Sequence, residues 1–169
     1  MNEEEIYVQT KHFLLSHDWI PLGGDPPKGT DLTRIEIKMP EEKVQSIKKN
    51  ENSIINDLVF GKERKLLLIE NKPQFNKNDV SKLNKLVDKE KWRKSFSNAM
   101  KQRNLLDKYE SIDRRGIISG ESLVKTLAFE GYPQKGLEDF VQICWEEGEN
   151  KPLVEVGNKV KDLPSPFSY

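Results

Sequence analysis

The chain has 169 residues, of which 35% are hydrophobic and 33% charged, and its formal net charge is zero. This length fits one compact domain, 1–169, and the longest apolar run, Leu66–Ile69, is far below the roughly 20 residues of a membrane-spanning helix, so we expect a cytoplasmic protein with no membrane contact. The zero net charge argues against coating nucleic acid by bulk electrostatics, and the single cysteine, Cys144, excludes an intramolecular disulfide or a cysteine-based zinc site.

The first part of the chain is expected to form a helix, a loop and a strand. Apolar residues over 3–16 recur at helical spacing behind an acidic first turn, which predicts a helix. The stretch 21–29 is rich in proline and glycine, which predicts a loop. Residues 34–39 alternate polar with apolar side chains, which predicts a half-buried strand ending at Pro40.

A β-hairpin is expected after a charged connector over 41–52. The segments 54–60 and 65–70 are strand-like, and only Gly61–Arg64 separates them. The second segment is apolar at four successive positions, which predicts burial on both faces and a central place in a sheet.

The second half of the chain combines helical and ambiguous patterns. Asp79 is placed to cap a helix through 81–87, and helical patterning continues toward residue 109. The segments 122–130 and 140–145 fit either helix or strand, whereas 153–156 alternates like a strand. Together these patterns predict an α/β protein.

Positive charge gathers in the middle of the sequence. Residues 81–115 carry 11 basic and five acidic side chains. We expect a contact with a nucleic-acid backbone there, although a solvated helical face would give the same pattern. The predicted nucleic-acid-binding residues are Lys82, Lys85, Lys89, Arg93, Lys94, Lys101 and Arg103.

The candidate catalytic residues lie at the end of the predicted buried strand. Glu-x-Lys occurs five times in the chain, so the triplet alone has little weight. Only Glu70-Asn71-Lys72 closes a run of buried aliphatic residues and has an aspartate, Asp57, in the preceding strand of the same hairpin. In a strand Glu70 and Lys72 point to one face and Asn71 points away, and hairpin pairing can bring Asp57 beside them.

Two neighbouring carboxylates repel each other unless a cation lies between them, and hard oxygen ligands suit Mg²⁺ or Mn²⁺. Such an ion lowers the pKa of bound water and neutralises charge on a phosphate. We therefore predict Asp57, Glu70 and Lys72 as catalytic residues, with Asp57 and Glu70 as metal ligands and Lys72 holding the water or the phosphate.

This arrangement resembles the D…(D/E)xK core of the PD-(D/E)XK, or restriction-endonuclease-like, nucleases, over about Ile54–Val87. In that group the two acids bind the catalytic divalent metal and the lysine assists the attacking water. The resemblance implies an α/β fold with a central mixed sheet flanked by helices. It also implies an auxiliary metal-binding glutamate on the opening helix, for which Glu5 or Glu4 is the candidate. Asn56 stands where the group's name has proline.

A second set of similar letters, Asp25 or Asp31 with Glu36 and Lys38, has a simpler interpretation. Arg34, Glu36 and Lys38 together form the polar face of an amphipathic strand. We therefore favour a structural role for this set.

Three functions follow from the sequence. The first is a Mg²⁺- or Mn²⁺-dependent endonuclease that hydrolyses phosphodiester bonds in DNA, with RNA as the alternative substrate. The second is a catalytically inactive nuclease-fold module that binds nucleic acid or a protein partner, and the third is an α/β interaction domain with no nucleic-acid role. A homodimer and a subunit of a larger complex are both compatible with a chain of this length.

Overall fold

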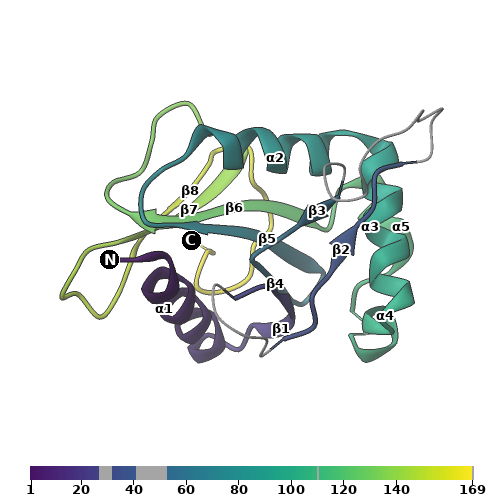
Figure 1. Cartoon of the computed structure of the whole chain (residues 1–169), viewed down its shortest axis with the longest axis horizontal. Coiled ribbons are helices and arrows are strands. Elements are labelled where there is room, and N and C mark those ends of the chain that lie inside the picture. The colour runs from purple at the N-terminus through teal and green to yellow at the C-terminus, as the bar shows by residue number, and fades with distance from the viewer. Residues whose placement is uncertain (27–31, 41–52, 110, 169) are drawn as a thin grey trace.

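A mixed β-sheet forms the centre of the protein. The computed structural model describes residues 1–26, 32–40, 53–109 and 111–168 (Figure 1). The sheet has the order β1-β4-β5-β6-β7-β8, in which β5, β6 and β7 are parallel and the other neighbours antiparallel. Its strands are β1 (Ile20–Gly24), β4 (Leu58–Lys62), β5 (Lys65–Lys72), β6 (Leu123–Glu130), β7 (Phe140–Trp145) and β8 (Leu153–Val156). The short strands β2 (Glu36–Ile37) and β3 (Ile54–Ile55) pair with each other in a separate antiparallel sheet.

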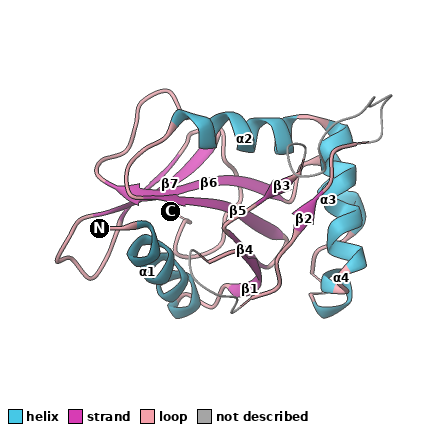
Figure 2. Ribbon diagram, viewed as in Figure 1, coloured by secondary structure: helices cyan, strands magenta, loops and turns pink. Residues whose placement is uncertain are grey.

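Helices cover both faces of the sheet, so the predicted α/β architecture with flanking helices is confirmed. One face packs against α1 (Glu3–Ser16), and the other carries α2 (Lys77–Asp88) and α3 (Glu90–Gln102) (Figure 2). The short helices α4 (Leu105–Lys108) and α5 (Arg114–Ser119) add residues to the α2–α3 side.

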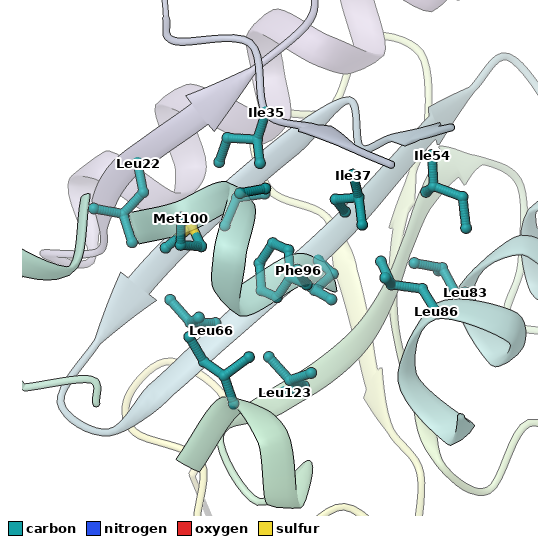
Figure 3. Close-up of a cluster of buried hydrophobic side chains, with 14 of the residues drawn as sticks. Leu22, Ile35, Ile37, Ile54, Leu66, Leu83, Leu86, Phe96, Met100 and Leu123 are labelled. Carbon is teal, nitrogen blue, oxygen red and sulfur yellow. The ribbon is translucent and has the colours of Figure 1, made fainter. Parts of the chain in front are cut away.

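The central strand β5 separates two hydrophobic clusters. Leu66 and Leu68 belong to the cluster under α2 and α3, whereas Leu67 and Ile69 belong to the cluster under α1, and all four are fully buried. The predicted burial of this strand on both faces is therefore confirmed. Figure 3 shows part of the first cluster, in which helical side chains pack against the sheet; labelled residues include Leu66, Leu83, Leu86, Phe96, Met100 and Leu123.

The helix predicted over 3–16 is confirmed at both ends. Asn2 caps it: its side chain accepts a hydrogen bond from the Glu5 backbone N–H at 2.8 Å, and the Glu5 carboxylate accepts one from the Asn2 backbone N–H at 2.8 Å. This reciprocal capping box satisfies two backbone N–H groups that a helix start leaves without partners.

The prediction of a loop from residue 21 was wrong, because Ile20–Gly24 forms β1 at the edge of the sheet. An edge strand tolerates Pro21, since a missing N–H on the outer side breaks no ladder. The glycines allow close packing: a Cβ atom on Gly23 would lie 2.3 Å from Cδ1 of Ile35, and one on Gly24 2.8 Å from the Tyr7 hydroxyl oxygen. The remainder of the predicted loop is described only at residues 25–26.

The hairpin is confirmed, with β4 and β5 antiparallel, but its first strand is interrupted. The predicted strand 54–60 divides at Asn56 and Asp57 into β3 and β4, and only Glu36–Ile37 of the predicted strand 34–39 forms a strand, β2. The charged connector over 41–52 lies outside the described residues. The break matters for the site, because it places Asp57 immediately before β4.

Further along the chain, the predicted helix over 81–87 lies within α2, but its cap is Asn76, whose side chain accepts a hydrogen bond from the Asn78 N–H at 2.8 Å. Asp79 is instead a buried residue of the first turn. The two ambiguous segments are the strands β6 and β7, and the predicted strand 153–156 is confirmed as β8. Cys144 is buried, and burial raises the pKa of its thiol to about 12. No helix within the described parts of the chain has the length and apolar composition needed to cross a membrane.

Candidate active site

The structure brings Asp57 and Glu70 into direct contact at the ends of β4 and β5. Leu58 lies opposite Ile69 in the ladder, so Asp57 stands beside Glu70. The backbone N–H of Asp57 donates to Oε2 of Glu70 at 3.1 Å, and the backbone N–H of Asn71 donates to Oδ2 of Asp57 at 2.7 Å. The two carboxylates are thus held by backbone groups of the same hairpin.

Glu70 is enclosed by the protein. Its side chain is 1% exposed; Oε2 also accepts a hydrogen bond from Nδ2 of Asn56 at 3.3 Å, and Oε1 is in contact with Nζ of Lys82. Nζ of Lys82 donates in addition to the backbone oxygen of Ile55 at 2.7 Å. Lys82 was predicted to bind nucleic acid, but here its ammonium group neutralises Glu70.

The ammonium group of Lys72, at the end of β5, reaches the first turn of α1. Its Nζ is 3.4 Å from Oε1 of Glu3. Burial lowers the pKa of Lys72, but the negative charges of Asp79, Glu3 and Asp57 outweigh burial and raise the pKa above its ordinary value. Lys72 is therefore a protonated group, suited to holding an anion and unsuited to accepting a proton.

The carboxylates of the site are electrostatically crowded. Burial and the neighbouring charge of Glu70 raise the pKa of Asp57 to about 8, against an ordinary value of 3.8. The same two causes raise the pKa of Asp79, which is 6% exposed, to about 6. Perturbed pKa values cluster at functional sites, which makes this group of carboxylates the candidate site.

A cavity of about 260 Å³ opens between α1 and the ends of the strands. It is lined by Glu3, Tyr7, Asp25, Pro26, Asp57 and Asn71. Asn71 is fully buried, and neither Oδ1 nor Nδ2 has a hydrogen-bond partner among the residues that the structure describes. A buried polar group without a hydrogen-bond partner lowers the stability of the folded protein by about 1–3 kcal/mol. A ligand that binds the amide of Asn71 would offset this loss.

The oxygen atoms of the site decide whether it fits a divalent cation. The described part of the chain contains no group of three or more His, Cys, Asp or Glu side chains that could hold a metal ion. Mg²⁺ is commonly bound by one or two carboxylates and keeps several waters. Asp57 and the unpaired Asn71 oxygen fit that requirement, whereas Glu70 would first have to exchange Lys82 for the ion.

Glu5 and Glu4 were the candidates for an auxiliary ligand on the opening helix, but the residue of α1's acidic first turn that lines the cavity is Glu3. The Glu5 carboxylate caps its own helix, which directs it away from the cavity. A sequence signal for Glu3 exists: helical spacing puts it on one stripe with Tyr7, Thr10 and Leu14, which are buried. Asp25, Asp79 and Asn71 were also missed as site residues.

Two arginines of the predicted nucleic-acid-binding set are bound to backbone carbonyl groups. Arg93 donates to the oxygen of Ile118 at 2.7 Å and to that of Val87 at 2.8 Å. Arg103 donates to the oxygen of Arg34 at 2.8 Å. These guanidinium groups connect elements of the fold.

The lysines of the set divide into two kinds. Lys85 lies over the ring of Trp92 at 5.0 Å, and Lys94 forms an exposed ion pair within α3 at 3.1 Å. Lys89 and Lys101 are exposed, and no contact of their side chains is described. Of the predicted set, these two lysines are therefore the ones whose side chains are most available to a partner.

The chain was compared with protein-family models, with curated proteins and with solved structures, and none of them matches it. The functional interpretation consequently depends on the site itself. Its central feature is the contact between Asp57 and Glu70, flanked by Lys72 and Lys82.

Proposed function

We propose that the chain is a divalent-metal-dependent endonuclease of the restriction-endonuclease-like, PD-(D/E)XK type, acting on phosphodiester bonds in DNA. The observation that carries this proposal is the contact of Asp57 with Glu70 at the end of a buried hairpin, with Lys72 on the same strand. The raised pKa of Asp57, due to burial and to Glu70, supports a site that favours a cation. The α/β architecture with a mixed sheet is compatible with this group.

Each side chain has a chemical role in this proposal. Asp57 and Glu70 would hold a Mg²⁺ or Mn²⁺ ion, which would lower the pKa of a bound water and neutralise charge on the phosphate. Backbone hydrogen bonds orient both carboxylates: the N–H of Asp57 donates to Glu70, and the N–H of Asn71 donates to Asp57. Lys72 keeps its proton and attracts the phosphate or orients the water, since its ammonium is partly exposed beside Glu3.

The proposal is tested by cleavage of double-stranded DNA, single-stranded DNA and RNA with Mg²⁺ or Mn²⁺. Asp57→Asn and Glu70→Gln should each lower the cleavage rate at least 100-fold while circular dichroism shows a folded protein. The matched control is Glu63→Gln, which changes a second Glu-x-Lys triplet in the exposed β4–β5 turn and should leave the rate unchanged. Full activity of either site variant would overturn the assignment.

The second candidate is a catalytically inactive module of the same fold that binds nucleic acid or a protein. One observation favours it: Lys82 already neutralises the carboxylate of Glu70. Under this alternative the protein binds no Mn²⁺ in calorimetry and cleaves none of the three substrates. Binding of Mn²⁺ that depends on Asp57 would contradict it.

A further inference from the structure

Asn71 is the middle residue of the Glu70-Asn71-Lys72 triplet, and its side chain leaves β5 on the face opposite that of Glu70, which contacts Lys82 of α2. Alternation along β5 directs Asn71 to the α1 side, where it lines the cavity beside Asp57. It is fully buried, and both polar atoms of its amide are without a partner among the described residues. A buried polar side chain without a hydrogen-bond partner requires an explanation, and a bound water or ion is one.

The surroundings of Asn71 favour a cation. Three carboxylate side chains, those of Glu3, Asp25 and Asp57, line the same cavity. The cationic groups near them are at its margin: Nζ of Lys72 is 3.4 Å from Glu3, and Nε of Arg34 is 3.8 Å from Asp25. Asp57 has no ion pair with a basic side chain among the described contacts, so the three carboxyl groups of the lining are accompanied by only these two paired cations.

We propose that Oδ1 of Asn71 is a ligand, together with the carboxylate of Asp57, of a hydrated divalent cation in this cavity. This inference rests on the metal dependence proposed above and assigns the ion to the α1 side of the strand ends, where Glu70 would join the ligands only after releasing Lys82. The cavity of about 260 Å³ has room for several waters at ~30 Å³ each, as a hydrated ion requires.

The chemistry of the lining distinguishes a cation from trapped water alone. A water molecule would satisfy the amide of Asn71 but would leave the charge of the acidic lining unchanged. A divalent cation coordinates the amide oxygen and one or two carboxylates, and water molecules occupy its remaining coordination positions. Glu3 and Asp25 then act through those waters or by their charge.

The test is calorimetric titration of the full chain with Mn²⁺, combined with thermal unfolding in EDTA. Asn71→Leu keeps the approximate shape of the side chain and removes both unpaired polar atoms, so its melting temperature in EDTA should equal or exceed that of the wild type. Its affinity for Mn²⁺ should nevertheless fall at least tenfold. Asn71→Asp adds a charged ligand and should bind Mn²⁺ at least threefold more tightly than the wild type.

The control is Ser97→Ala, which removes another unpaired buried polar atom, Oγ of Ser97 on α3, and should leave Mn²⁺ affinity unchanged. Affinity within twofold of the wild type for both Asn71 variants, with loss of binding in Asp57→Asn, would overturn the role of Asn71 and leave the metal-dependent function standing. No Mn²⁺ binding by the wild type would overturn both. If Asn71→Leu does not fold, the affinity of Asn71→Asp decides between these outcomes.

Discussion

Lys82 on α2 reaches across to the end of β5 and neutralises Glu70, while the same ammonium group donates to the backbone oxygen of Ile55 at 2.7 Å. The side chain of Glu70 is 1% exposed and that of Lys82 is 29% exposed. A carboxylate so deeply buried depends on a positive charge supplied by the protein or by an ion. Lys82 is therefore a built-in counter-ion of the site.

Lys82→Met should consequently destabilise the protein when divalent ions are absent. Removing one partner of a buried ion pair leaves the other charge without compensation, and we expect the free energy of unfolding to fall by about 2–3 kcal/mol, a value reduced for the partial exposure of Lys82. Urea denaturation in EDTA measures this change. Adding Mg²⁺ should restore more stability to the variant than it adds to the wild type, because the ion replaces the lost ammonium.

Lys125→Met is the matched control for this prediction. Nζ of Lys125 is buried and contacts Asp88, at 3.0 Å, and Asp139, but those carboxylates are 55% and 49% exposed. Water can solvate both of them when the lysine is lost, so the expected loss is smaller, about 1 kcal/mol. An equal loss for the two variants, or no Mg²⁺ effect in Lys82→Met, would contradict the counter-ion role.

The parts of the fold that could be predicted are those with a clear local period. The opening helix and the β4–β5 hairpin follow from helical spacing and from two strand-like runs around a short turn. The strands β6 and β7 remained ambiguous because they are buried on both faces, which removes the alternation that identifies a strand. The strand β1 was missed because its proline and glycines are tolerated only at a sheet edge, and an edge is a property of the tertiary structure.

The candidate site, too, could be predicted only in part from the sequence. Asp57 and Glu70 could be brought together from the sequence because they are 13 residues apart in one hairpin. Glu3 meets Lys72 across 69 residues, and no local pattern specifies that contact. Lys82 was assigned to nucleic acid because charge patterning reports how many basic residues a segment carries and not which carboxylates they face.

The stability of the protein should fall as the pH rises from about 4 to 8. The pKa of Asp57 is raised from 3.8 to about 8 by burial and by the charge of Glu70, and that of Asp79 is raised to about 6. Acids whose pKa is higher in the folded protein bind protons more tightly there than in the unfolded chain. They favour folding below about pH 4, and this contribution is lost as the pH rises through the folded pKa.

Asp57→Asn isolates this contribution, because the amide does not titrate. Urea denaturation between pH 5 and 8 in EDTA should show a steeper loss of stability in the wild type than in the variant. Mg²⁺ should reduce the wild-type slope, since a cation favours the charged form of the carboxylate. Parallel curves for the two proteins would show that Asp57 does not carry the shifted pKa.

Arg93 and Lys101 provide the last prediction, because they belong to the same basic segment but differ in their contacts. Arg93 is bonded to two backbone carbonyl groups, whereas Lys101 is exposed on α3. Arg93→Gln should lower the free energy of unfolding by about 1.5–3 kcal/mol. Lys101→Gln should change it by less than about 0.5 kcal/mol but reduce the slope of log affinity for DNA against log salt concentration by about 0.9. Fluorescence anisotropy across a salt series measures DNA binding, and urea denaturation measures the stability of each variant. If Arg93→Gln has wild-type stability and a reduced salt slope, Arg93 contacts the phosphate backbone instead.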